Sequence, residues 1–585
     1  MRHLTINAVC VLFTFIIITV AAGAQDSEPV QNYSVWVGSH YTSLSDYAKK
    51  IGEYNLGNDE FLPEFKGIYQ YRDADKLIMV NGHYFDHKNI DGTVTGIFGD
   101  RVRGEVYYRS MIRQEGQDLL ENMAAREKTA AGGAGGKILT HEIQDFGADY
   151  NTHRYEAGAD VNILLSRKNN IRMMVAHRSI FKKGEEQKVA SNHCFSCHLT
   201  SRTMDVDRQT HQFQTGIQAD ISDFTVGYQF GFRYFDSKAE DVTMYYDNAQ
   251  HPVSGANEEE FASRLNFEDT TLAYGTYPET EKMSHKLRFK GDIGKGRFSS
   301  SIGYSKAKNK GTELEADAWT GAANYTMPLS KRTRLIAKVA GTRLTADDPF
   351  IDLAEYREGR DGTNTDAAIT NFDFVRYSSL DRADARVSAE VISRVSPRAT
   401  LSVLAGYNHI DRYDYPTIDE HYKTNKFYGQ AKLRYRKGLR YSNMIKYRFE
   451  KTSDPFRSFR GLFEQAGRNV LEPDVTPGGT FGGYLFSYYL REDLRYQNIT
   501  TQPTDAHIFE FSSTYRPTMK TNIMFGIKGQ YDKNGDLDSL DVKHLSLRPH
   551  ATVTLNPNPK WSVLTGYTFG YYKSRGPITV ALFDG

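Results

Sequence analysis

Near the middle of the chain stands the sequence Cys-Phe-Ser-Cys-His, which begins at Cys194. Two thiols separated by two residues can form thioether bonds to the vinyl groups of a haem, and a histidine directly after them can bind the iron. The spacing therefore predicts one covalent c-type haem on Cys194 and Cys197, with His198 as the proximal ligand. Of the nearby histidines, His211 and His177 are the candidates for a distal ligand, although each can equally be an ordinary solvated histidine.

The same two thiols have two other uses. In an oxidising compartment they can form a local disulfide, and in a metalloprotein they can form half of a metal site. The chain holds three cysteines, and the third, Cys10, lies in the leader described next. The remaining pair is too small a set for a disulfide-stapled scaffold. The sequence leaves haem, disulfide and metal open, and the haem spacing is the most specific of the three matches.

The N-terminal residues have the organisation of a secretion signal. A basic start at residues 1–3 precedes a mostly apolar run from Ala8 to Ala22, and a small residue at Ala24 closes the segment. This pattern predicts a signal peptide over residues 1–24, cleaved before Gln25, and an exported single domain over residues 25–585. The apolar run is too short to be a permanent membrane span.

Composition excludes several classes of protein. No later segment approaches about 18 consecutive apolar residues, so a helical membrane protein is excluded. Lys and Arg total 73 against 72 for Asp and Glu, so the charge balance gives no reason to expect a nucleic-acid partner. No nucleophile–base pair, phosphate loop or paired carboxylate stands out, so we expect that the chain is not an enzyme.

Side chains alternate between apolar and polar along many segments, with a period of two residues. Such alternation predicts β-strands that place one set of side chains on lipid and the other in a lumen. The clearest examples are 155–165, the hairpin 213–221 with 224–234, the segment 383–391, and the hairpin 427–435 with 441–449.

Connections between these strands alternate in length. We expect short turns at 167–170, 222–223, 293–296, 327–331, 395–398, 437–438, 516–517 and 556–559. Long segments at 183–207, 236–282, 346–380 and 451–504 have the size of external loops. Short turns with long loops are typical of bacterial outer-membrane barrels. The sequence thus predicts an all-β fold, a transmembrane antiparallel β-barrel of about 22 to 26 strands, which residues 578–585 could close against residues 33–37.

One expected hairpin carries a series of basic residues on its polar face. They are Lys426, Lys432, Arg434, Arg436, Lys446 and Arg448. A hydrated lumen accounts for them without any further role. Alternatively, they line the lumen for an anionic solute or for an acidic partner inserted in it.

With these features together, the chain resembles the MtrB/PioB family of outer-membrane barrels, which sheathe multihaem c-type cytochromes. The resemblance is architectural over most of the mature chain. Its most specific local parts are Trp36 and the stretch from Val175 through Cys194 and His198 to Asp207. Family members often carry a CxxC pair near the mature N-terminus, whereas here the pair lies in the middle of the chain.

The resemblance implies a conduit in the bacterial outer membrane. In that family the barrel insulates a periplasmic cytochrome, which passes electrons to an external cytochrome or a mineral. We therefore expect a multihaem c-type cytochrome inside the barrel, an external cytochrome as a further partner, and contact with outer-membrane lipid. The alternative expectation is a diffusion porin or solute transporter whose own loops close the pore.

Overall fold

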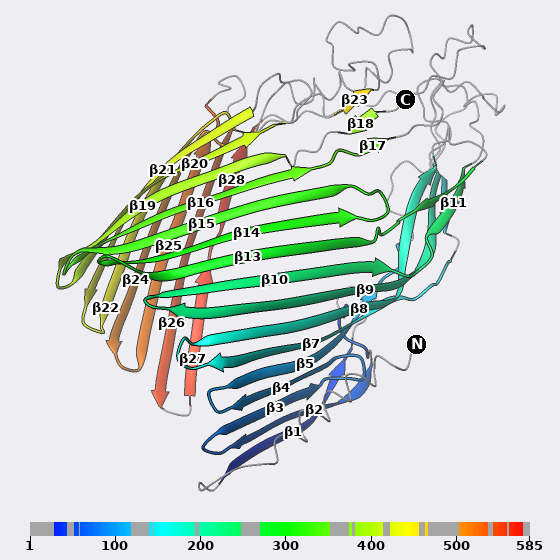
Figure 1. Ribbon diagram of the computed structural model, residues 1–585, viewed down its shortest axis with the longest axis horizontal. Helices are drawn as coiled ribbons and strands as arrows, with labels where there is room; N and C mark the ends of the chain where they lie inside the picture. Colours follow the sequence, from blue (N-terminus) through cyan, green and yellow to red (C-terminus); the bar gives the residue numbers. More distant parts are fainter. Residues whose placement is uncertain are drawn as a thin grey trace, which may run out of the picture. The chain divides into compact units, whose positions relative to one another are not determined.

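The computed structural model describes residues 29–43, 52–57, 59–118, 140–143, 145–192, 198–246, 270–351, 374–376, 381–413, 422–455, 463–465, 502–535, 542–558 and 561–576. Every regular element in these ranges is a β-strand (Figure 1). One sheet holds 23 strands, and two small sheets hold two and three. The predicted all-β fold, with one large antiparallel sheet of about 22 strands or more, is confirmed. Within these ranges, no helix is long and apolar enough to cross a membrane.

One compact unit comprises Met1–Gly116, Asp149–Glu186 and Asp205–Ile217. Its strands form antiparallel pairs between neighbours in the chain, from β1 with β2 through β7 with β8. Their bounds are β1 Val30–Thr42, β2 Glu60–Arg72, β3 Lys76–Tyr84, β4 Ile90–Phe98, β5 Val102–Glu115, β7 Tyr150–Ser166, β8 Ile171–Asn192 and β9 His198–Ile221. The last two strands extend beyond this unit.

The second unit continues the same pattern with antiparallel neighbours. The strands of its large sheet are β10 Phe224–Ser237, β13 Thr280–Ile293, β14 Gly296–Asn309, β15 Glu315–Ser330, β16 Thr333–Ala346, β19 Arg382–Ser396, β20 Ala399–Arg412, β21 Tyr422–Lys437, β22 Tyr441–Ser453, β24 Asp505–Thr518, β25 Thr521–Lys533, β26 Lys543–Asn558, β27 Trp561–Thr568 and β28 Tyr571–Arg575. Both β27 and β28 pair with β26, so they are two parts of one interrupted strand.

Short strands make up the remainder. They are β6 Thr140–Ile143, β11 Val242–Tyr246, β12 Thr270–Tyr274, β17 Phe350–Ile351, β18 Phe374–Arg376 and β23 Phe463–Gln465. The strand β6 pairs with the start of β9 in parallel, whereas β11 pairs with β12 and β18 with both β17 and β23 in antiparallel fashion. The predicted signal peptide and the predicted closing segment 578–585 lie outside the described residues.

Tight turns occur close to where the sequence predicts them. Ser222 adopts a positive φ of 54° in the turn from β9 to β10, and Gly294 and Gly438 adopt φ of 60° in two others. Glycine reaches this region without steric cost, which fixes the turns at Gly294 and Gly438, whereas Ser222 adopts it at some steric cost. The predicted turn at 516–517 is wrong, because both residues belong to β24 and the turn falls at 519–520.

The predicted external loop at 183–207 is also wrong. The strand β8 continues to Asn192 and β9 starts at His198, so only residues 193–197 separate two strands of 22 and 24 residues. Lys183 and Asp207, expected in a loop, form an ion pair of 3.2 Å across the two strands. Residues 183–188 are polar on both faces, and so they lack the apolar alternation from which the sequence predicts a membrane strand.

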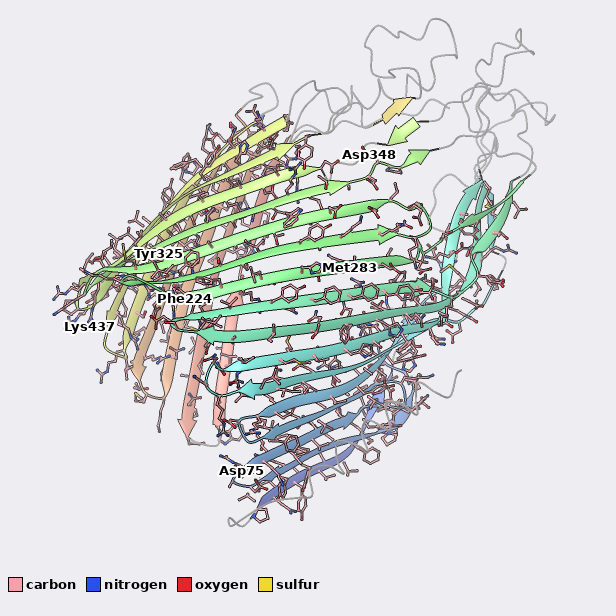
Figure 2. All side chains as sticks on the ribbon, viewed as in Figure 1. Asp75, Phe224, Met283, Tyr325, Asp348 and Lys437 are labelled. Carbon is pink, nitrogen blue, oxygen red and sulfur yellow. The ribbon has the colours of Figure 1, made fainter. Side chains whose placement is uncertain are left out.

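The strands have one apolar and one polar face. In β21, Phe427 is 52% exposed and Leu433 is 41% exposed on the same face, while Lys426 and Lys432 occupy the other. Phe224, Met283 and Tyr325, labelled in Figure 2, lie on the apolar faces of β10, β13 and β15. Exposed apolar side chains in such continuous rows require an apolar solvent, so we call the apolar face the outward face and the polar face the inner face.

Candidate functional sites: a hairpin connection and the inner wall

The Cys-Phe-Ser-Cys-His motif lies at the connection between the two longest described strands. Cys194 and Cys197 fall in residues 193–197, outside the described residues, and His198 is the first residue of β9. The donor set fits a covalent haem in its chemistry, because it offers two thiols and one imidazole at the required spacing. Within the described residues, no group of three or more metal-ligating side chains is present.

The two candidates for the distal ligand lie elsewhere. His211 stands thirteen residues beyond His198 on the same continuous strand, and a strand rises about 3.3 Å per residue, so the two are separated by about 40 Å. His177 lies beside His211, with ring centroids 6.1 Å apart. Neither His177 nor His211 can therefore bind an iron that is held by His198. A haem at this motif would take its second ligand from other residues.

His177 and His211 instead belong to an outward aromatic cluster. His211 contacts Phe181 edge-on at 5.6 Å, and Phe181 stacks on Tyr155 at 5.6 Å. The hydroxyl of Ser179 lies 2.9 Å from Nδ1 of His211. Aromatic rings with a polar edge commonly lie at the boundary between lipid and water. The cluster of these four rings fits that location.

On the inner face of the first unit, Glu156 of β7 is the centre of a charged cluster. It is only 5% exposed. Arg178 donates from Nε and Nη2 at 2.7 and 2.9 Å, Tyr107 donates its hydroxyl at 3.0 Å, and Arg154 donates a further bond. The cluster joins β5, β7 and β8 and satisfies its carboxylate fully, so it stabilises the wall and offers no free acid.

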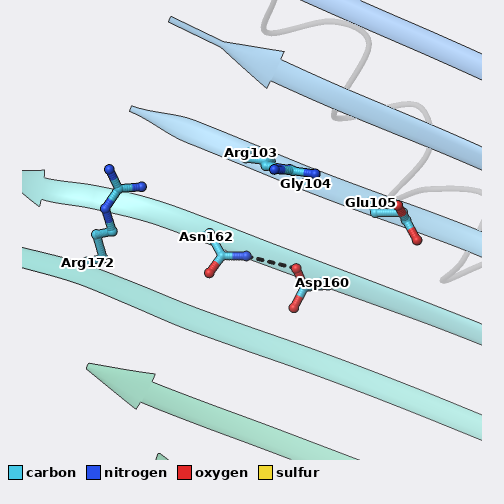
Figure 3. Close-up of a pocket in the computed structure, with 6 residues that line it drawn as sticks. All are labelled: Arg103, Gly104, Glu105, Asp160, Asn162 and Arg172. Carbon is cyan, nitrogen blue, oxygen red and sulfur yellow. Dashed lines mark hydrogen bonds between the residues drawn. The ribbon is translucent and has the colours of Figure 1, made fainter. Parts of the chain in front are cut away.

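A cavity of about 440 Å³ is lined by residues of the same three strands, β5, β7 and β8 (Figure 3). Asn162 donates to Asp160 at 2.8 Å within it. Its walls carry both signs of charge, and its lining residues are Arg103, Gly104, Glu105, Asp160, Asn162 and Arg172. This mixed, open lining resembles the hydrated interior of a barrel more than a ligand pocket, because binding pockets are mostly apolar.

The predicted basic wall of β21 and β22 is partly neutralised. Glu450 accepts from Lys426 at 3.0 Å and from Arg448 at 2.6 Å. Glu510 of β24 accepts from Lys446 at 3.1 Å. Sequence reasoning missed the pairs of Lys426 with Glu450 and of Lys446 with Glu510 because they depend on the register between strands. Arg448 and Glu450 lie two residues apart on the same strand. Half of the predicted set thus takes part in ion pairs on the wall.

A second series of basic residues, which sequence reasoning missed, lies on β13. We call Lys282, Lys286, Arg288 and Lys290 the cationic ladder; all four are exposed and share the inner face. Their alternation with Met283, Leu287 and Phe289 was a signal that the sequence already carried. Within the described residues, none of the four forms an ion pair.

Neutral and mostly small residues flank three of the four ladder residues on both sides, whereas Lys282 lies opposite Ala307 and Arg233. In the register with β14, Lys286, Arg288 and Lys290 lie opposite Gly303, Ser301 and Ser299. Towards β10, the same three residues lie opposite Gln229, Gly227 and Thr225. Among the described residues, no ion pair neutralises the ladder, and the side chains beside it are mostly small. An anionic group can therefore approach the ladder closely.

No protein-family model and no curated protein matches the chain. Among solved structures, it is similar to the copper transporter OprC, with 8% identity over 90% of this chain and 74% of that one and a TM-score of 0.42. It is also similar to the FrpB iron transporter from Neisseria meningitidis (F3-3 variant), with 9% identity over 89% and 77% and a TM-score of 0.45. A third is the siderophore receptor PiuA from Acinetobacter baumannii, with 11% identity over 91% and 75% and a TM-score of 0.39. Nothing about this chain's own ligand follows from these likenesses.

The strands themselves identify the kind of barrel. They are long enough to cross a bilayer when tilted, since about ten residues suffice. They carry an outward apolar face, alternate with short turns at one end, and leave longer connections at the other. These are the properties of a transmembrane β-barrel of the bacterial outer membrane. The chain is such a protein, with its short turns assigned to the periplasmic end.

Proposed function

We propose that the chain sheathes a multihaem c-type cytochrome and so forms a conduit for electrons across the outer membrane, as in the MtrB/PioB family that it resembles. The observation that carries the proposal is the cationic ladder of β13. The four cations are exposed and form no ion pair within the described residues, and on β14 three of them lie opposite glycine or serine. This arrangement favours an acidic protein surface that packs against the wall.

The size of the barrel supports an occupant. Barrels of about eight strands are filled by their own side chains, whereas barrels of 22 strands enclose a lumen that a plug must occupy. Here the inner side chains of β14 and β15 opposite each other are small, with Ser301 beside Ala322 and Gly303 beside Thr320. Such a wall leaves room for a folded partner.

We further propose that the barrel itself carries one c-type haem on Cys194 and Cys197, with His198 as proximal ligand. When bound, the haem supplies a one-electron carrier at the connection between β8 and β9. The two thiols would anchor the ring covalently, and the imidazole of His198 would bind the iron. The hairpin end lies on the side that we assign to the exterior, where an external cytochrome would receive the electron.

The alternative function is a diffusion porin or solute transporter. The same cationic ladder favours it, because a row of exposed cations attracts anionic solutes by electrostatic focusing. The two functions differ in what fills the lumen. A cytochrome would exclude solute and carry electrons, whereas an open barrel would pass ions and carry none.

Co-purification tests the proposal directly. The tagged full chain should bring down a haem-staining protein in a fixed ratio. The double variant Lys286→Glu and Arg288→Glu should lose most of that protein, while the control Lys437→Glu and Arg440→Glu, at the periplasmic turn, should retain it. Retention of the partner by both variants would overturn the role of the ladder.

Proteoliposomes then separate the two functions. With the purified complex, an external reductant should reduce an enclosed dye faster than with the barrel alone. If the complex transfers electrons no faster, and the barrel conducts small anions by itself, the conduit is wrong and the porin function replaces it.

A further inference from the structure

Six arginines lie at the periplasmic end of six neighbouring strands in the second unit. We call them the arginine rim: Arg332 before β16, Arg394 on β19, Arg398 before β20, Arg436 on β21, Arg440 before β22 and Arg516 on β24. All six residues are exposed. Lys437, labelled in Figure 2, marks this end of β21. Strands in a sheet are about 4.8 Å apart, so the rim extends over about 24 Å.

The strand registers bring these arginines together in three opposing pairs. In each pair, the backbone N–H of one arginine donates to the backbone carbonyl of the other at 2.7 to 2.8 Å. These hydrogen bonds continue the antiparallel pairing by one residue at the turn end of each strand pair. The pairs are Arg332 with Arg394, Arg398 with Arg436, and Arg440 with Arg516. Like charges directly opposite each other on neighbouring strands are destabilising, so an anionic partner that offsets the repulsion would stabilise this end of the sheet.

Among the described residues, no carboxylate neutralises the arginine rim. The four turn segments 327–336, 392–402, 432–444 and 511–525 contain twelve Lys and Arg and no Asp or Glu. Within the described ranges none of the six arginines forms an ion pair, and Arg394 and Arg516 donate instead to neutral oxygens, at 3.0 and 3.1 Å. A turn of the first unit differs, because there Arg167 pairs with Asp100 at 2.7 Å. The excess of positive charge is therefore a property of the turns of the second unit.

Exposed apolar residues lie at the tips of turns at the same end. Leu439, between β21 and β22, is 62% exposed, and Met519, between β24 and β25, is 89% exposed. Both belong to connections and not to the strands, so the lipid around the strands does not account for their exposure. Arginine and methionine are enriched in protein–protein interfaces. A small anion or a phosphate polymer, by contrast, has no use for exposed apolar side chains.

We propose that the arginine rim, with Leu439 and Met519, is the docking surface for an acidic soluble protein of the periplasm. Guanidinium groups bind carboxylates through two parallel hydrogen bonds, so the rim suits Asp and Glu side chains of a partner. Its length of about 24 Å exceeds that of a small anion and is comparable with the width of a standard interface, about 800 Å² per partner. The arginines alternate with outward residues such as Tyr441 and Tyr515, so they face away from lipid headgroups. The proposal is independent of what occupies the lumen, because it concerns the turns.

Fluorescence anisotropy on the full chain in phosphatidylcholine nanodiscs tests the proposal, with a labelled eight-residue peptide of alternating Glu and Leu as the probe. Such a peptide spans about 26 Å when extended, which is comparable with the rim. Arg398→Gln with Arg436→Gln removes the opposing pair at the centre of the rim. Arg101→Gln with Lys168→Gln, in turns of the first unit, removes the same charge and is the matched control. Empty nanodiscs show any binding of the probe to lipid, and heat-modifiable gel mobility confirms that each variant is folded.

The rim variant should bind the peptide about tenfold more weakly than the native chain, since each exposed charge pair contributes about a factor of three, and the control should bind it within about twofold. Leu439→Ser with Met519→Ser should weaken peptide binding about threefold and leave the binding of inorganic polyphosphate unchanged. Equal loss in the rim variant and its control, or loss in neither, would overturn the proposal. Unchanged peptide binding by the Leu439 and Met519 variant would also overturn it, because the rim would then recognise negative charge alone.

Discussion

The imidazole rings of His177 and His211 lie nearly parallel, with centroids 6.1 Å apart and planes within 10° of each other. The hydroxyl of Ser179 lies between them, 3.3 Å from Nε2 of His177 and 2.9 Å from Nδ1 of His211. In the second unit, Tyr228 and His285 make a comparable outward contact, with the hydroxyl 2.8 Å from Nδ1. Histidines of this chain thus recur in outward aromatic clusters. In each of the two clusters, a hydroxyl group lies within hydrogen-bond distance of a histidine ring nitrogen.

Haem content should not depend on the stacked histidines. The double variant His177→Ala and His211→Ala should carry as much haem per chain as the native protein, because both side chains lie on the outward face about 40 Å along the strand from His198. A pyridine haemochrome assay on the purified chain measures this. His198→Ala is the positive control and should lower the haem per chain. Loss of haem in the double variant would mean that His177 or His211 binds the haem iron after all.

Exchange of neighbouring residues on β21 tests the assignment of faces. Leu433 lies outward and is 41% exposed, whereas Arg434 lies inward. Leu433→Arg should impair insertion at a cost of about 2 to 4 kcal/mol if the residue lies near the midplane. Arg434→Gln should be tolerated. The fraction of folded chain on a heat-modifiable gel distinguishes them, and equal behaviour would mean that the two faces are misassigned.

A single glycine allows β8 to continue past the end of its pairing with β7. Gly184 has φ of 140° and lies opposite Thr152, the last such pair, where a Cβ would stand 2.1 Å from the carbonyl oxygen of Asn151. Gly184→Ala should therefore cost about 1 to 3 kcal/mol of stability. Gly82→Ala is the matched control, because a Cβ there meets no atom within 4 Å. Unfolding in guanidinium, followed by tryptophan fluorescence, measures the stability of both variants. Equal unfolding midpoints would mean that a side chain at position 184 causes no strain.

The buried carboxylate of Glu156 contributes to stability through hydrogen bonds to charged groups. Glu156→Gln removes the charge that holds Arg178 and Arg154, and it should lower stability by about 2 kcal/mol, the range of a hydrogen bond to a charged group. Glu105→Gln, on the neighbouring β5, is the control, because Glu105 is exposed and its hydrogen bond from Thr95 is long, at 3.4 Å. If both variants unfold at the same denaturant concentration, the cluster is not a stabilising one.

The alternation of side chains predicts the membrane strands well because its cause is local. A strand between lipid and water must alternate, and so 427–435 and 441–449 are recognised within β21 and β22. The extension of β8 and β9 could not be predicted in this way. Residues such as Glu185, Glu186 and Gln187 leave no apolar face, although they continue a strand.

Contacts between strands are beyond the reach of a single sequence. Lys446 was predicted on the inner face, but its partner Glu510 lies 64 residues further along the chain. Only the register of β22 with β24 brings them together, and a shift of one residue would place Glu510 on the outward face.

The remaining prediction concerns the two thiols. If a haem is attached, the denatured and purified chain should keep the mass of one haem and stain for peroxidase activity, because thioether bonds survive denaturation. The double variant Cys194→Ser and Cys197→Ser should lose both signals while it still inserts, since the strands β8 and β9 form their pairings without them. A local disulfide would give the opposite result. It would brace the hairpin end by restricting the unfolded chain, add no haem mass, and allow alkylation of the two cysteines only after reduction. A chain with that behaviour would remove the haem from the proposed function and leave the inserted cytochrome to carry electrons alone.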